Sequence, residues 1–272
     1  MFDVIAEMFS YSFMQRALIA GILVSLCAAL LGVSLVLKRY SMIGDGLSHV
    51  GFGALAMATV LNLSPLAVSI PIVVIAAFFL LRLSENSKLK GDCAIALIST
   101  TALALGVLAV SVTDGVNTDI MNFMLGSILA MRQSDVYLCI VLSVVVIILF
   151  VIFYNKIFTV TFDESFAKAT GTNAGAYNML IAFLTAITIV LGMRMMGSLL
   201  ISSLIVFPAL TSMRLFKSFK SVMISSAIVS VICFTLGLIL SYILSLPTGA
   251  SVVTVNFAVF LLFCVVSVIK KK

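Results

Sequence analysis

The chain has 272 residues, of which 63% are hydrophobic and 10% are charged, and its mean hydropathy is +1.32. Soluble domains carry about 25% charged residues, so this composition excludes an ordinary soluble protein and indicates a chain that uses lipid as its solvent. The net charge of +6 does not indicate nucleic-acid binding, because the basic residues form short clusters between apolar runs, as cytoplasmic loops do.

Apolar runs that approach the length of a membrane span recur along the whole chain. A span needs ~20 apolar residues, and polar residues separate nine such runs. They cover residues 17–37, 43–62, 66–81, 93–112, 136–154, 174–192, 197–213, 221–243 and 250–269. Because two of the runs are short, we expect eight or nine crossings in an all-α, polytopic membrane bundle that forms one domain over residues 1–272.

A further apolar stretch, Ile120–Met131, has 12 residues and is too short to span. It lies between Asp119 and Arg132, so we expect a re-entrant or interfacial piece. The polar segments between the runs are only loop-sized, so a domain that binds nucleotide or captures ligand in solution must belong to another chain.

The basic residues predict the orientation of the chain. With an outside N-terminus and nine crossings, the cytoplasmic segments hold Lys38, Arg39, Arg82, Lys88, Lys90, Lys156, Lys168, Arg214, Lys217, Lys220 and Lys270–Lys272. Only Arg16, Arg132 and Arg194 remain for the other side, as the positive-inside rule expects. Asp3 and Glu7 stand where a signal peptide would carry Lys or Arg, so we expect the mature chain to begin at Met1.

The predicted cytoplasmic loop 155–173 has an amphipathic pattern of its own. Thr161 and Glu164 fit a capping box, and Gly171 fits a helix exit. We therefore expect a short surface helix between Thr161 and Gly171. The pattern alone does not distinguish an ordinary helix lying on the membrane from a helix with a binding role.

The second apolar run contains an acid and the only histidine of the chain. Asp45 and His49 are four residues apart and share one face of a helix. Carboxylate and imidazole are ligands of Zn²⁺, Mn²⁺ and Fe²⁺, and an intramembrane ionisable group normally faces a cavity and a partner. Two interpretations stay open: a site for a transported ion, and a structural polar pair near the cytoplasmic interface. Two ligands are too few for a metal site. A symmetric dimer would bring Asp45 and His49 of both copies together and supply four.

The stretch Gly192–Thr211 combines two glycines, several hydroxyls and Pro208. This combination predicts a broken or kinked helix. Such a helix either lines a transport pathway or reflects the general frequency of Gly and Pro in membrane helices. Its methionine cluster, Met193 to Met196, is interpreted as apolar packing and not as a soft-metal site.

Enzyme motifs are absent from the sequence. It has no Gly-x-x-x-x-Gly-Lys-Ser/Thr loop, no His-Glu-x-x-His and no Gly-x-Ser-x-Gly, so we expect no catalysis in this chain and no permanently bound cofactor. The cysteines stand singly, without Cys-x-x-Cys spacing, and are expected to be small core residues. They are Cys27, Cys93, Cys139, Cys233 and Cys264.

Four stretches together carry a recognisable pattern: Arg39–His49, Thr161–Gly171, Gly197–Ala209 and Leu246–Ala250. In order and spacing, over almost the whole chain, they resemble the integral membrane permease of bacterial zinc/manganese/iron ABC importers, closest to the zinc-uptake branch. The resemblance implies a homodimer in the bacterial cytoplasmic membrane. It also implies two copies of a cytoplasmic ATPase and an extracytoplasmic protein that delivers Zn²⁺ or Mn²⁺.

The resemblance also implies roles for individual residues. Asp45 and His49 match metal-coordinating residues of the transport pathway. The loop helix matches a coupling helix that seats in the ATPase, with Glu164, Ala167 and Gly171 at its acidic, small and glycine positions. Family members often have alanine in place of Gly46, and the glycine is expected to loosen the geometry of the pair.

Three alternatives remain at this point. An ion-gradient-driven secondary cation transporter would use the same pair without an ATPase. A membrane scaffold would use its polar residues only to hold helices together. An ABC permease for iron chelates or cobalamin would need a wider cavity and no direct metal ligands. Because Asp plus His suits several divalent metals, zinc is favoured by resemblance only.

Overall fold

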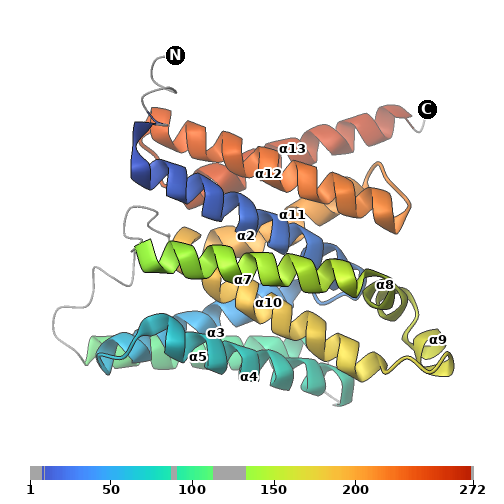
Figure 1. The fold of residues 1–272 in the computed structure, drawn as a ribbon, viewed down its shortest axis with the longest axis horizontal. Coiled ribbons are helices and arrows are strands. Elements are labelled where there is room, and N and C mark those ends of the chain that lie inside the picture. Colours follow the sequence, from blue (N-terminus) through green and yellow to red (C-terminus); the bar gives the residue numbers. More distant parts are fainter. Residues whose placement is uncertain (1–7, 9, 87–90, 113–132, 271–272) are drawn as a thin grey trace.

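The computed structural model describes residues 8, 10–86, 91–112 and 133–270. Within these ranges the regular structure consists of α-helices (Figure 1). They are α2 (Ser12–Leu37), α3 (Ser41–Val60), α4 (Pro65–Asn86), α5 (Gly91–Ser111), α7 (Gln133–Ile152), α8 (Tyr154–Phe162), α9 (Glu164–Ala169), α10 (Ala174–Met196), α11 (Ser198–Met213), α12 (Phe219–Leu244) and α13 (Thr248–Lys270).

Each of the nine apolar runs corresponds to one long helix, which confirms the predicted all-α fold. Seven of these helices, α2, α4, α5, α7, α10, α12 and α13, are long and apolar enough to cross a membrane. The other two are α3, which carries the Asp and His, and α11, which has 16 residues and spans only ~24 Å. The number of crossings stays a prediction, and the predicted re-entrant piece Ile120–Met131 lies outside the described residues.

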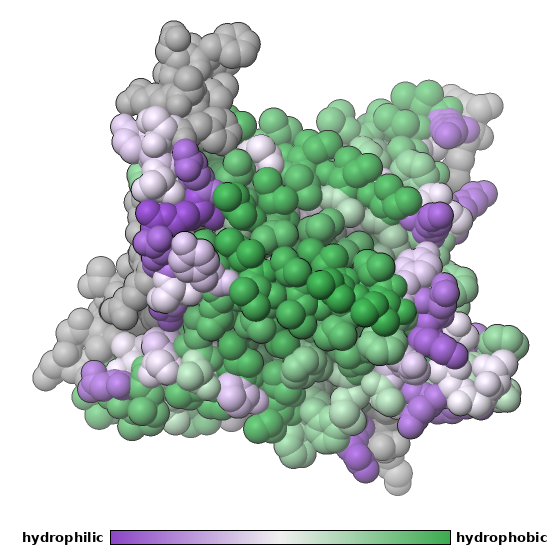
Figure 2. All heavy atoms as spheres, viewed as in Figure 1, coloured by the Kyte–Doolittle hydropathy of each residue, from purple (hydrophilic) through white to green (hydrophobic). Residues whose placement is uncertain are grey.

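The long helices form a bundle in which α2, α7 and α10 run through the middle of the view (Figure 1). Helices α11, α12 and α13 pack together on one side, and α3, α4 and α5 pack together on the other. Among the candidate spans α10 and α2 are the most buried and α13 is the most exposed. Figure 2 shows hydrophobic residues across the middle of the molecule and hydrophilic residues at its two ends, as a bilayer requires.

Glycines allow the closest helix contacts in the bundle. A Cβ on Gly32 of α2 would lie 2.0 Å from the Ile205 carbonyl oxygen of α11, and a Cβ on Gly53 of α3 would lie 2.5 Å from the Ala102 carbonyl oxygen of α5. Both neighbouring atoms belong to the backbone, so they cannot move aside alone. Small residues at such points allow membrane helices to approach closely.

The stretch Gly192–Thr211 is a broken helix, as predicted. Helix α10 ends at Met196, Gly197 has φ 85° and ψ 162°, and α11 begins at Ser198. A φ in this range favours glycine. Pro208 lies within α11, and the three methionines of the cluster are buried in the core, in agreement with a packing role.

The cysteine prediction is only partly correct. Cys27, Cys139 and Cys233 are buried and free, as expected of core residues. Cys264 is half-buried and Cys93 is exposed, because their helices, α13 and α5, lie at the outside of the bundle.

The loop 155–173 contains two short helices, and the predicted cap at Thr161 is wrong. Thr161 lies inside α8 and is buried, because α8 continues while its Phe158 and Phe162 pack against Phe219 of α12. The N-cap of α9 is Asp163, whose Oδ1 accepts a hydrogen bond from the Phe166 backbone N–H at 2.9 Å.

The predicted exit at Gly171 is correct. Gly171 has φ 77°, its N–H donates to the Lys168 carbonyl, and the N–H of Thr172 donates to the Ala167 carbonyl. These two bonds form a Schellman motif, which satisfies the last carbonyls of α9. The sharp turn directs the chain from α9 into α10.

The close contact at Gly32 yields a first prediction. Gly32→Ala places a methyl group against the backbone of α11, so α2 and α11 must separate, at a cost of about 1–3 kcal/mol. We expect a lower midpoint of thermal unfolding in detergent and less folded protein in the membrane. Gly175→Ala is the control, because its Cβ would meet only Asn173 Oδ1 at 3.6 Å. Equal stability of the two variants would contradict the packing argument.

Candidate functional site

Helix α3 places Asp45 and His49 side by side near its N-terminus, one helical turn apart. His49 Nε2 lies 3.5 Å from Asp45 Oδ2, so the structure brings the two predicted residues together. The Asp45 side chain is 51% exposed and that of His49 is 28% exposed. One side of the pair is therefore open to a further ligand.

A residue from a distant part of the chain completes this group. Ser202 of α11 donates from Oγ to Asp45 Oδ1 at 3.5 Å, and its Oγ lies 3.4 Å from Ser48 Oγ. Ser48 also donates to the Gly44 carbonyl of its own helix, and Ser202 Oγ lies 3.1 Å from the Ser198 carbonyl, which competes with Asp45 for its one proton. We call Asp45, Ser48, His49 and Ser202 the α3–α11 polar group.

Sequence reasoning noticed the hydroxyls of the Gly192–Thr211 stretch but did not single out Ser202. The available signal was the spacing of Ser198 and Ser202, which are four residues apart and share one helix face directly after the Gly197 break. Only the packing of α11 on α3 shows that this face meets Asp45.

Gly46 has a packing function. A Cβ at this position would lie 2.5 Å from Ile95 Cγ2 of α5, so the glycine allows α5 to approach α3 directly beside Asp45. Helix α3 is continuous through this point, and the pair lies within one regular helix. The structure therefore gives Gly46 a packing role, and its effect on the geometry of the pair stays a prediction.

The donors in this group are one carboxylate, one imidazole and two hydroxyls. Among the described residues no group of three or more His, Cys, Asp or Glu side chains lies together. A tetrahedral zinc site takes four ligands. Asp45 and His49 of one chain supply two of them. The open side of Asp45 and His49 is where further donors would enter.

A second polar group joins the short helix α9 to the bundle. Glu164 Oε1 lies 2.8 Å from Lys168 Nζ, and Glu164 Oε2 accepts from Asn178 Nδ2 at 3.2 Å. Lys38, at the end of α2, lies 3.9 Å from Glu164 Oε2 and donates to Asn178 Oδ1. We call Lys38, Glu164, Lys168 and Asn178 the α9 polar group; it connects α9 with α2 and α10.

The predicted coupling residues occupy different environments. Glu164 anchors α9, and Gly171 forms its exit. Ala167 is fully buried against Val160 and Ala174, so it faces its own chain. The large apolar side chain that α9 exposes is Phe166, which is 58% exposed. A partner protein would therefore meet Phe166, while Ala167 allows α9 to lie close to α8 and α10.

The α9 polar group changes the ionisation of Glu164. The hydrogen bond from Lys168 is the largest cause that lowers the pKa of Glu164 below its ordinary value, and Asn178 and Lys38 act in the same direction. Partial burial opposes them. Because this carboxylate is held charged in the folded state, its contribution to stability is complete above its ordinary pKa and is lost as the pH falls through the lowered pKa.

An ion pair at the other end of the bundle was not predicted. Arg194 of α10 donates from Nε and Nη2 to Asp135 Oδ2 of α7, at 3.2 and 2.7 Å. Both side chains are largely buried. The sequence placed Arg194 outside the cytoplasmic clusters but gave no indication of its partner, which lies 59 residues away.

The sequence model of the ABC 3 transport family matches residues 10–267. Relatives include the zinc uptake protein ZnuB of Haemophilus influenzae, 30% identical over 90% of this chain and 94% of the relative. The manganese import permease ScaB of Streptococcus gordonii is 27% identical over 95% of this chain and 93% of the relative.

The solved structure of PsaBC from Streptococcus pneumoniae in complex with Fab contains a similar chain. It superposes with a TM-score of 0.86 and 29% sequence identity, over 96% of this chain and 94% of that one. The likeness therefore covers almost the whole chain.

The ionisation of Glu164 yields a prediction on pH. Glu164→Gln removes the charge that Lys168 and Lys38 stabilise, so the variant should unfold at a slightly lower temperature than the wild type at pH 7. The difference should narrow as the pH falls below about 4.5, the ordinary pKa of the group. Thermal unfolding in detergent across this pH range measures it. Asp163→Asn, which keeps an N-cap acceptor, is the control; a difference that stays constant with pH would refute the prediction.

Proposed function

Because this chain belongs to the ABC 3 transport family, we propose that it is the membrane permease of a bacterial importer for a divalent transition metal ion, with zinc as the first candidate. The observation that carries this proposal is the α3–α11 polar group, in which Asp45 and His49 lie 3.5 Å apart on the open side of α3. Family membership argues against the ion-gradient-driven transporter and the scaffold. The direct donors favour a bare ion over a chelate.

The metal is the substrate, and its identity is proposed from chemistry and relatives. Carboxylate with imidazole binds Zn²⁺, Mn²⁺ and Fe²⁺. The relatives include proteins named for zinc uptake and for manganese import, at 30% and 27% identity. Zinc is placed first because the motifs resemble the zinc-uptake branch, and manganese and iron are the competing substrates.

The donors have distinct roles in the proposed pathway. Asp45 supplies negative charge and one or two oxygens, and His49 supplies a neutral nitrogen. Ser202 donates to the Asp45 oxygen that does not face His49, which orients the carboxylate. A second copy of the chain supplies the missing donors across a two-fold axis, since a C₂ contact brings the same residues of both copies together.

Energy is proposed to come from a separate ATPase, two copies of which bind the permease dimer at α9. The present chain has no phosphate-binding loop. Helix α9 offers the exposed Phe166 to a partner, and the α9 polar group transmits its movement to α2 and α10. An extracytoplasmic binding protein delivers the metal, and the chain lies in the bacterial cytoplasmic membrane with its N-terminus outside and its C-terminus in the cytoplasm.

The pathway role of His49 predicts loss of uptake on substitution. In cells that carry the cognate ATPase and binding protein, His49→Ala should lower uptake of radiolabelled Zn²⁺ about tenfold or more at matched membrane expression. Parallel assays with Mn²⁺ and Fe²⁺ identify the substrate. Thr59→Val, which removes a hydroxyl bonded to Leu55 on the same helix, is the control and should transport normally. Undiminished uptake by His49→Ala would refute the assigned site.

The exit of α9 predicts which substitutions uncouple the ATPase. At φ 77°, valine costs on the order of 1–2 kcal/mol whereas asparagine tolerates the conformation. A Cβ at Gly171 meets nothing within 4 Å, so the two variants differ mainly in backbone strain. Gly171→Val should co-purify with less ATPase and transport less metal, and Gly171→Asn should behave like the wild type. Equal ATPase recovery in both variants would show that the turn does not position α9.

A further inference from the structure

A large apolar groove lies between α12 and α13, on the outside of the bundle. It has a volume of about 640 Å³. Ile224, Ile228 and Ile232 line it from α12, and Leu262 and Phe263 line it from α13. The three isoleucines are spaced by four residues and each is half-exposed. A groove of this composition, on two helices long and apolar enough to cross a membrane, fits a hydrocarbon chain.

Two basic residues adjoin the lining of the groove at one end. Its lining includes Phe216 and Ser221, and their chain neighbours are Lys217 and Lys220, both exposed. No acidic side chain lines the groove, and among the ion pairs of the described residues none involves these two lysines. The groove therefore combines an apolar lining with two basic residues beside one end.

We infer that the α12–α13 groove binds an anionic phospholipid, with an acyl chain along the isoleucines and its phosphate at Lys217 and Lys220. Basic pockets between membrane helices on the cytoplasmic side bind anionic headgroups, and the positive-inside rule places this end in the cytoplasm. The ammonium groups also reach the headgroup layer, while their stems follow apolar surface. This site is separate from the proposed metal pathway.

A second copy of the chain is the competing occupant, and charge disfavours it. A two-fold contact through the groove would place the same basic residues of both copies in one interface. The α12–α13 face is therefore left to lipid.

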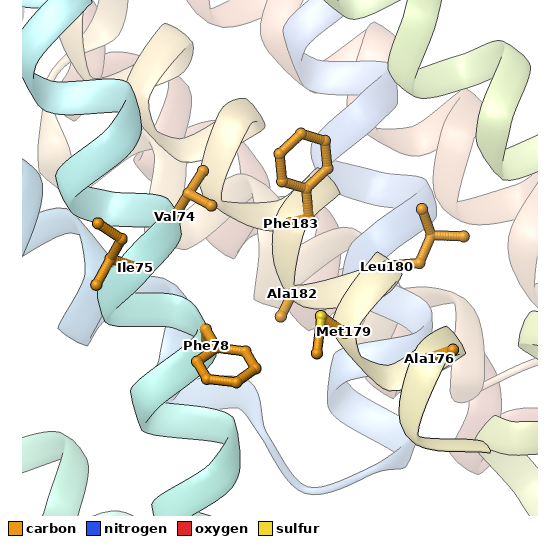
Figure 3. A pocket seen from close by; sticks show the side chains of 8 residues that line it. All are labelled: Val74, Ile75, Phe78, Ala176, Met179, Leu180, Ala182 and Phe183. Carbon is orange, nitrogen blue, oxygen red and sulfur yellow. The ribbon is translucent and has the colours of Figure 1, made fainter. Parts of the chain in front are cut away.

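A second groove provides an internal comparison. It has a volume of about 490 Å³ and lies between Val74, Ile75 and Phe78 of α4 and Met179 and Phe183 of α10 (Figure 3). Phe183 lies on the α10 wall, away from the N-terminus of that helix. The lysines near the N-terminus of α10, Lys38 and Lys168, are paired with Glu164, so a probe at Phe183 reports an apolar groove whose nearby lysines are neutralised by an acid.

The chain has no tryptophan, so a single introduced tryptophan reports on its own surroundings. We would place Ile228→Trp in the full-length permease and reconstitute it in bilayers with brominated phosphatidylglycerol or brominated phosphatidylcholine of the same acyl chains. Bromine quenches indole fluorescence on contact. Ile232→Trp is the second probe if the first variant does not fold. Phe183→Trp and Leu236→Trp, the latter half-exposed on α12 outside the groove, are the controls.

The expected result is half-quenching of Ile228→Trp at an about 25-fold lower mole fraction of the anionic lipid than of phosphatidylcholine, since each of the two lysines contributes about fivefold. The preference should disappear when Lys217→Gln and Lys220→Gln are added, and the control probes should show none. Equal quenching by both lipids, or a preference that survives loss of the lysines, would overturn the inference. Protection from both lipids in a dimeric sample would assign the groove to a second copy.

Discussion

No water is available inside a bilayer to pair with backbone N–H and C=O groups, so a spanning segment must satisfy these groups within itself. Helices do so, and the same requirement extends to polar side chains. In α12, Ser230 donates to the Ser25 carbonyl of α2 at 2.9 Å, and Ser226 donates to the Ala29 carbonyl at 3.4 Å. These hydroxyls join two helices across the core. The two serines of α12 are thus explained by hydrogen bonds between helices, whereas the partly exposed Asp45 and His49 invite a functional explanation.

Hydrophobic burial contributes little between helices in lipid, so close packing determines which faces meet. Gly32 allows α11 to approach α2, and Gly53 allows α5 to approach α3. Helix α11 also packs on α3, which brings Ser202 to Asp45. The position of the α3–α11 polar group therefore depends on glycines that have no chemistry of their own.

The two polar groups are connected through the end of α2. Lys38 contacts Glu164 of α9 and Asn178 of α10. It is also the C-cap of α2, and α3 begins at Ser41 after a turn in which Arg39 has φ 62°. Direct contacts thus connect α9 with the start of the helix that carries Asp45. This arrangement gives a physical route between a partner bound at α9 and the proposed metal pathway.

The sequence by itself determined features that depend on spacing along one helix. The lengths of the apolar runs predicted nine helices, the four-residue spacing placed Asp45 beside His49, and Gly171 marked the exit of α9. Only the tertiary structure decided which helix faces meet. Ser202 lies 157 residues from Asp45, and the cap moved from Thr161 to Asp163 because α8 packs on Phe219. Local periodicity fixes the helices, whereas contacts between them depend on side-chain packing that no single run of residues contains.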